Sequence, residues 1–76
     1  MSQEFLSHDQ VEDLVKKDLQ RRYQNLKYLE FTHVELLERF KEWWLFGIIE
    51  VPLGFRSFMY ILDAKTGEIK SFEVRI

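Results

Sequence analysis

The chain has 76 residues, with 13 acidic side chains, 11 basic side chains and no cysteine. A chain of this length has room for one domain, residues 1–76, and buries only about 60% of the surface that its unfolded form exposes. The lack of cysteine excludes disulfides and thiolate metal sites. A net charge of −2 with mixed signs argues against nucleic-acid binding, which usually needs a basic face. Two histidines alone cannot form a structural zinc site, so we expect no metal and no cofactor.

The hydropathy pattern also argues against a membrane protein. The longest apolar run, from Trp43 to Ile49, is far too short to span a bilayer. Residues 1–6 show neither the positive segment nor the apolar segment of a signal peptide. We therefore expect a cytoplasmic location, or an extracytoplasmic one if a leader has been removed.

Residues 8–24 are predicted to form a helix. Ser7 and Gln10 have the spacing of a capping box, and Asn25 is the expected C-terminal stop. Acidic residues come early in this segment and basic residues come late, which suits the helix dipole. The apolar stripe at helical spacing consists of Val11, Leu14, Val15, Leu19 and Tyr23.

After Asn25 the hydrophobic period shifts toward two, which indicates strands. We predict strands near 28–38, 42–51, 56–63 and 68–76, joined as an antiparallel meander. Residues 51–54 suit a type I turn, and residues 63–68 suit a hairpin in which Gly67 is left-handed. The segment 34–43 could instead form a second helix, which would leave a three-stranded sheet. The outer strands carry many charges, as edge strands commonly do.

The predicted central strands are apolar on both faces. Alternation in the second strand separates Trp43, Leu45, Ile49 and Val51 from Trp44, Phe46 and Ile48. Alternation in the third strand separates Phe58, Tyr60 and Leu62 from Met59 and Ile61. A three-residue loop at 65–67 would pair Tyr60 with Phe72 and Phe58 with Val74. We assign the helix to that richer face, which leaves the face of Met59 and Ile61 with one of the two tryptophan sets.

One helix can cover only one face of a sheet, and the other face would be a large apolar patch. We expect a second copy of the chain or another protein to bury it; alternatively, the 34–43 segment or the N-terminal arm folds over it. One tryptophan of the pair 43–44 should lie in the core and the other on the second face. The candidate interaction residues are Trp43, Trp44, Phe46, Ile48, Met59 and Ile61.

In Phe58–Ile69 an aromatic and apolar strand ends in Asp63, which begins the turn Asp-Ala-Lys-Thr-Gly-Glu. This segment resembles the closing hairpin of PepSY domains. The order of one helix followed by antiparallel strands is also similar. The resemblance implies a non-enzymatic module, proposed in that family to modulate peptidases or to act as a binding or propeptide element. The helix here has fewer small residues than the family's helix, and the family's modules usually lie outside the cytoplasm.

Few residues suggest catalysis. His33 and Glu35 lie two apart on an edge strand and could act as an acid–base pair, although a polar decoration of the strand is the favoured interpretation. The basic residues of the helix read as a solvated face, and Asp63 reads as a turn residue. We predict an α+β fold with a cystatin- or PepSY-like layout, no catalytic residues, and a role in protein interaction. The alternative is a ligand-binding protein or small enzyme with His33 in a cleft between helix and sheet.

Overall fold

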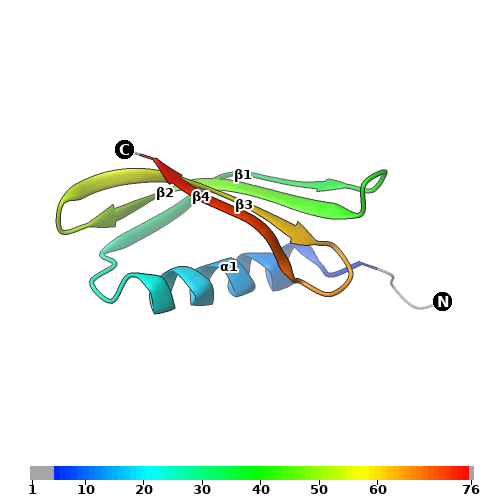
Figure 1. The fold of residues 1–76 in the computed structure, drawn as a ribbon, viewed down its shortest axis with the longest axis horizontal. Coiled ribbons are helices and arrows are strands. Elements are labelled where there is room, and N and C mark those ends of the chain that lie inside the picture. The colour runs from blue at the N-terminus through cyan, green and yellow to red at the C-terminus, as the bar shows by residue number, and fades with distance from the viewer. Residues whose placement is uncertain (1–4, 76) are drawn as a thin grey trace.

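The computed structural model describes residues 5–75 as one helix and one antiparallel sheet (Figure 1). Helix α1 spans His8–Arg22. The strands are β1 (Tyr28–Leu37), β2 (Glu42–Val51), β3 (Gly54–Asp63) and β4 (Ile69–Arg75). The sheet has the order β1-β2-β3-β4, and α1 runs along one face of it. The predicted α+β class and four-stranded meander are confirmed.

Helix α1 begins at the predicted capping box. The Ser7 hydroxyl accepts a hydrogen bond from the Gln10 backbone N–H at 3.2 Å, and the Gln10 side chain accepts one from the Ser7 N–H at 2.8 Å. These bonds satisfy two backbone donors that the first turn leaves free. The helix ends at Arg22 with Tyr23 as its C-cap, two residues before the predicted end. Asn25 therefore lies in the connection to β1 and does not stop the helix.

The capping box gives a direct test of how much α1 contributes to stability. Replacing Ser7 by alanine removes the hydroxyl that accepts from Gln10, and we expect unfolding to require about 1 kcal/mol less free energy. Urea denaturation followed by far-UV circular dichroism measures this loss. Replacing Ser7 by aspartate, which can cap equally well, should retain most of the stability. Equal losses in both variants would contradict a capping role.

The segment 34–43 is not a second helix. Val34–Leu37 completes β1, and residues 38–41 form the turn into β2. The helical spacing of its leucines is coincidental, because the alternating Val34 and Leu36 pack against the core from an edge strand. Strand β3 starts at Gly54, two residues earlier than predicted, since Val51 pairs directly with Gly54 and leaves Pro52 and Leu53 as a two-residue loop.

The β3–β4 hairpin forms as the turn residues indicate. The Asp63 carboxylate accepts hydrogen bonds from the backbone N–H groups of Thr66 at 3.0 Å and Lys65 at 2.8 Å. These two donors hold the pKa of Asp63 below its ordinary value. Gly67 has φ of +83°, which is the left-handed region expected of it. The strands beyond the turn pair Tyr60 with Phe72 and Phe58 with Val74, as predicted.

The core lies between α1 and one face of the sheet. Buried side chains from the helix meet a second set from β2 and β3. Tyr60, Leu45, Ile49, Leu19 and Val11 are completely buried. The face of Phe58, Tyr60 and Leu62 is therefore the helix-facing one, which confirms that prediction. Phe5 and Leu6 also pack against this core, so the described part of the N-terminal arm does not cross to the other face.

Candidate functional site

The face of the sheet opposite α1 carries an apolar surface at its centre. It consists of Trp44, Phe46 and Ile48 from β2 with Met59 and Ile61 from β3, and we call it the open face. All five side chains are half-buried, because neighbouring side chains on the sheet shield one another. Figure 1 shows α1 on one side of the sheet and no described segment on the other. The apolar centre therefore faces outward within residues 5–75.

Three cross-strand rows order the open face. Each row begins with a polar residue on β1, crosses β2 and β3, and ends with a polar residue on β4. The rows are Glu30–Ile48–Ser57–Arg75, His33–Phe46–Met59–Glu73 and Glu35–Trp44–Ile61–Ser71. A β-bulge at Thr32 keeps Glu30 and His33 on the same face although three positions separate them. The result is an apolar stripe along the strands with a polar border on each side.

Two aromatic rings dominate this stripe. The Trp44 and Phe46 ring centroids lie 6.3 Å apart, and the His33 ring lies 5.8 Å from Phe46. The Trp44 indole N–H donates to Glu42 at 3.0 Å, and Lys70 donates to the other oxygen of Glu42 at 3.1 Å. Both bonds lower the pKa of Glu42, the one from Trp44 more. Trp44 is thus held by its polar end while its ring faces outward.

A shallow groove lies beside these rings. Its volume is about 510 Å³, and all four strands line it. Phe46, Ile48 and Met59 form its apolar part, and Glu73 and Arg75 form a charged part on β4. Apolar grooves rimmed by a few polar groups are typical of binding surfaces.

Trp43 does not belong to the open face. It pairs with Leu62 on the helix-facing side and retains 7% of its exposure. Its indole N–H donates to the Leu6 backbone oxygen at 3.0 Å, which anchors the chain before α1. The two-residue loop at Pro52 and Leu53 sets the β2–β3 register that turns Trp43 inward and Trp44 outward. Of the six candidate interaction residues, the structure therefore brings five together and places Trp43 in the core.

His33 and Glu35 form a hydrogen-bonded pair on the exposed surface of the sheet. The His33 Nε2 lies 3.0 Å from the Glu35 carboxylate, and the two side chains are 56% and 51% exposed. They point to one face, as their spacing predicts. That face is the open face, so His33 lies on the opposite side of the sheet from the helix. The structure does not bring His33 into the helix–sheet cleft.

The helix–sheet cleft contains a buried carboxylate instead. The cleft has a volume of about 320 Å³ and lies between α1, β3 and the β3–β4 turn. At its inner end Asp18 accepts hydrogen bonds from Tyr60 at 2.5 Å, Arg22 at 2.6 Å and Arg21 at 2.5 Å. Burial raises the pKa of Asp18, but the bonds from Tyr60, Arg22 and Arg21 together lower it below its ordinary value. Burial and the Asp18 charge raise the pKa of Tyr60, which therefore remains a donor.

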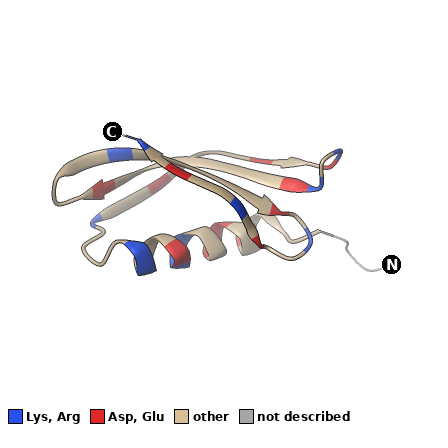
Figure 2. Ribbon diagram, in the orientation of Figure 1, with Lys and Arg blue, Asp and Glu red and all other residues tan. Residues whose placement is uncertain are grey.

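This buried network explains most of the basic cluster on α1. Arg21 and Arg22 are paired with Asp18, and the Arg22 guanidinium lies 4.0 Å from the centre of the Phe72 ring. Lys17 pairs with Asp13 at 3.1 Å. Figure 2 shows both signs of charge along the helix and along the sheet. These pairings support the interpretation of the helix as a solvated, internally paired face.

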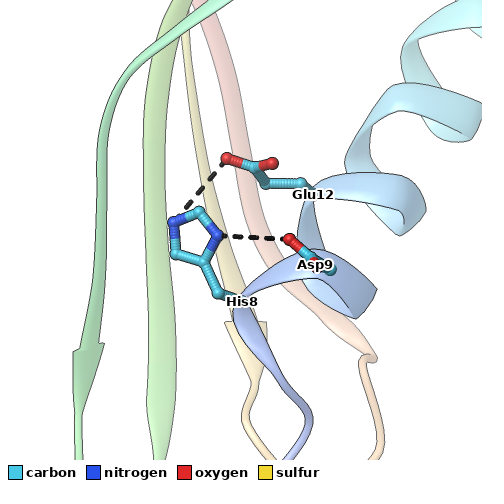
Figure 3. Close-up of side chains that lie close together, drawn as sticks. All are labelled: His8, Asp9 and Glu12. Atoms are coloured by element: carbon cyan, nitrogen blue, oxygen red, sulfur yellow. Dashed lines mark ion pairs between the residues drawn. The ribbon is translucent and has the colours of Figure 1, made fainter.

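One further polar cluster lies at the start of α1 (Figure 3). His8 is 3.8 Å from Asp9 and 3.7 Å from Glu12, and atoms of all three lie within 4.8 Å of one another. His8 and Asp9 are exposed, and the His8 ring also packs edge-on to Trp43 at 6.0 Å. Early acidic residues stabilise a helix N-terminus without any ion. The cluster is therefore explained by helix formation.

Asp18 is the residue that pattern reasoning missed. It interrupts the basic residues of α1 and looks like a solvated acid. A usable signal was present, because Asp18 follows Val11 by seven positions and Leu14 by four, which places it on the apolar stripe. An acid on a buried helix face requires a donor, and Tyr60 supplies it from 42 residues away.

Comparisons with known proteins identify no relative. No family model matches the chain, and no curated protein or solved structure matches it. Within the described residues, α1 is too short and too polar to cross a membrane.

Proposed function

We propose that this chain is a non-enzymatic interaction module that buries the open face of its sheet against protein, in the first instance against a second copy of itself. The observation that carries the proposal is the apolar character of β2 and β3 on both faces, of which α1 covers one. Strands with two apolar faces are normally covered on both sides. The similarity of the closing hairpin to PepSY domains, which implies a modulatory role, fits the same proposal.

The size of the open face suits a stable complex. Three strands of ten residues and one of seven, about 4.8 Å apart and with a rise of about 3.3 Å per residue, give a footprint of roughly 600 Å². Side chains roughen that footprint, which brings it near the roughly 800 Å² per partner of a standard interface. The centre is apolar and the border is polar, which is the usual anatomy of such interfaces. Trp44 lies near the middle, and tryptophan is enriched among residues that dominate binding energy.

The helix–sheet cleft supports a ligand-binding function less well. The charged groups at its inner end, Asp18 and Arg21, already satisfy each other. A second arginine and the Tyr60 hydroxyl complete the network, and no buried side-chain polar atom in the described residues lacks a partner. A ligand would have to displace these bonds, whereas the open face needs only to lose water. We therefore favour the open face as the functional surface.

Replacing Phe46 by glutamate tests the proposal. The wild-type chain should sediment above its monomer mass of 9.3 kDa at micromolar concentration. A charge at the centre of the open face should weaken association about 100-fold, because a buried aromatic contact is lost and a carboxylate would need to be desolvated. Sedimentation velocity over a concentration series measures the dissociation constant.

The matched control is Phe40→Glu. Phe40 lies in the β1–β2 turn and is 62% exposed, so the same change there leaves the open face intact. This variant should associate like the wild type, and both variants should retain the wild-type far-UV spectrum. A wild-type chain that stays monomeric, or a Phe46→Glu variant that associates normally, would refute the proposed function.

A further inference from the structure

The charges bordering the open face distinguish between the two simplest ways in which two copies can pack. Two identical faces can meet about a two-fold axis that lies between the sheets. The axis can run parallel to the strands or across them. The parallel axis places β1 over the partner's β4, and the crosswise axis places β1 over the partner's β1. Because β1 and β4 border the stripe with different residues, the two arrangements differ in electrostatic energy.

The parallel axis brings opposite charges together. It lays each cross-strand row over the same row of the partner in reverse order. Glu30, which accepts from Tyr28 at 2.8 Å, then faces the partner's Arg75, which binds Glu73 of its own chain at 3.2 Å. His33 faces that same Glu73 of the partner, so the four groups bring both signs of charge to the border. At the centre, Phe46 lies over the partner's Met59, and Trp44 lies over the partner's Ile61. Sheets packed face to face lie about 10 Å apart at about 30°, so the long side chain of Arg75 can reach across.

The crosswise axis brings like charges together. If it runs along the central His33 row, it places Glu30 over the partner's Glu35 at the β1 border. At the β4 border it places Glu73 over the partner's Glu73, and each of these carboxylates has only Arg75 of its own chain to offset the repulsion. Like charges facing each other in an interface cost several kcal/mol and exclude wrong arrangements. The polar border therefore selects the parallel axis.

The remaining acids on this face do not reverse that choice. Under the parallel axis Glu42 lies toward the partner's Asp63. Glu42 already holds Lys70 at 3.1 Å, and Asp63 already accepts from two backbone N–H groups of its turn. The crosswise axis would instead set Glu42 toward the partner's Glu50, and no described residue forms an ion pair with Glu50. The parallel axis thus has one like-charged approach at its ends, between two acids that already hold donors of their own chain, whereas the crosswise axis adds Glu50, unpaired within residues 5–75, to its like-charged contacts.

We infer that two copies pair open face to open face about a two-fold axis parallel to the strands, with Glu30 of each copy bound to Arg75 of the other. This inference rests on the proposed function and adds the identity and orientation of the partner. Charge complementarity carries it, together with the match in footprint. Each dimer contains the Glu30–Arg75 contact twice, so reversing one charge changes two contacts.

Charge reversal in two separate variants tests the arrangement. Glu30→Arg sets arginine against arginine in its own dimer, and Arg75→Glu sets glutamate against glutamate. Each variant alone should associate at least about tenfold more weakly than the wild type. An equimolar mixture should recover wild-type affinity as a heterodimer. One of its two contacts then pairs the unchanged Glu30 and Arg75, and the other pairs the two introduced residues with opposite sign.

Sedimentation velocity of the single variants and of the mixture measures this recovery, with one chain carrying a small mass tag to identify the heterodimer. The control Glu38→Arg makes the same change in the exposed β1–β2 turn and should affect neither association nor mixing. Recovery in the mixture supports the arrangement. A mixture as weak as its components overturns the arrangement, while the proposed function stands if Phe46→Glu still dissociates the wild-type dimer. An intact dimer in Phe46→Glu overturns both.

Discussion

Replacing Asp18 by asparagine is expected to lower the free energy of unfolding by about 3 kcal/mol. Asp18 is 5% exposed and accepts from Tyr60, Arg21 and Arg22. The amide keeps the shape of the side chain, but it loses the charge and turns one acceptor into a donor. The Tyr60 hydroxyl is completely buried, so it has no water to bond if the amide nitrogen faces it, and the two arginines lose the charge that they pair with. Urea denaturation at pH 7 measures the loss.

The pH dependence of stability gives this prediction a second readout. The folded-state pKa of Asp18 lies below its ordinary value of 3.8. A depressed carboxyl pKa contributes stability that is fully present above the unfolded value and is lost as the pH falls through the folded value. Wild-type stability should therefore decline below about pH 4, and Asp18→Asn should decline less steeply. The difference between the two curves removes the contributions of other carboxylates, such as Asp63.

The matched control for Asp18 is Asp13→Asn on the same helix. Asp13 pairs with Lys17 at 3.1 Å, and both side chains are more than half exposed. Exposed pairs of this kind contribute at most about 1 kcal/mol, so the control should unfold nearly like the wild type. Equal losses for Asp13 and Asp18 would mean that the buried network does not stabilise the fold.

Replacing Gly47 by alanine is expected to lower the free energy of unfolding by about 3 kcal/mol. A Cβ at this position would lie 2.2 Å from the Glu30 backbone oxygen and 2.5 Å from the Phe58 ring. Neither neighbour can move freely. Glu30 is held in the β1–β2 ladder, and Phe58 is 3% exposed and packed edge-on between Phe31 and Tyr60. Thermal denaturation and urea titration both measure the loss.

A double-mutant cycle with Phe58→Leu identifies the contact responsible. Phe58→Leu alone should destabilise by creating space, but its cost should be smaller in the Gly47→Ala background because the smaller side chain relieves the ring clash. Relief should be partial, since the clash with the backbone oxygen remains. If Gly47→Ala folds with wild-type stability, the close packing of Phe58 over β2 is wrong.

Local chemistry predicted most of the secondary structure. Ser7 and Gln10 mark the start of α1, and the Asp63–Gly67 turn fixes the β3–β4 register. Both are predictable because the interacting groups lie within five residues of one another. The helix-facing side of β3 also followed from the same turn, since alternation carries the register along the strand.

Contacts between distant segments were not predictable in the same way. The inward orientation of Trp43 depends on the direct pairing of Val51 with Gly54, and a third strand that begins near residue 56 left the choice between Trp43 and Trp44 open. The Asp18–Tyr60 bond joins residues 42 positions apart. No turn-forming residue in the sequence predicts the bulge at Thr32. The bulge nevertheless places Glu30 on the open face and thereby sets the charge pattern of the border. Such features follow from packing, which a local pattern does not contain.

The meander has a consequence for the order in which the chain assembles. Each strand is hydrogen-bonded only to its neighbours in sequence. Every strand pairing therefore closes a short loop, which costs little entropy. Within residues 5–75, long loops close when α1 and the segment before it dock onto the sheet, as the Asp18–Tyr60 and Leu6–Ala64 bonds show. The entropic barrier to folding should therefore lie in that docking event. Until α1 docks, both faces of the partly formed sheet expose apolar side chains. Chains are therefore most prone to aggregate at that stage.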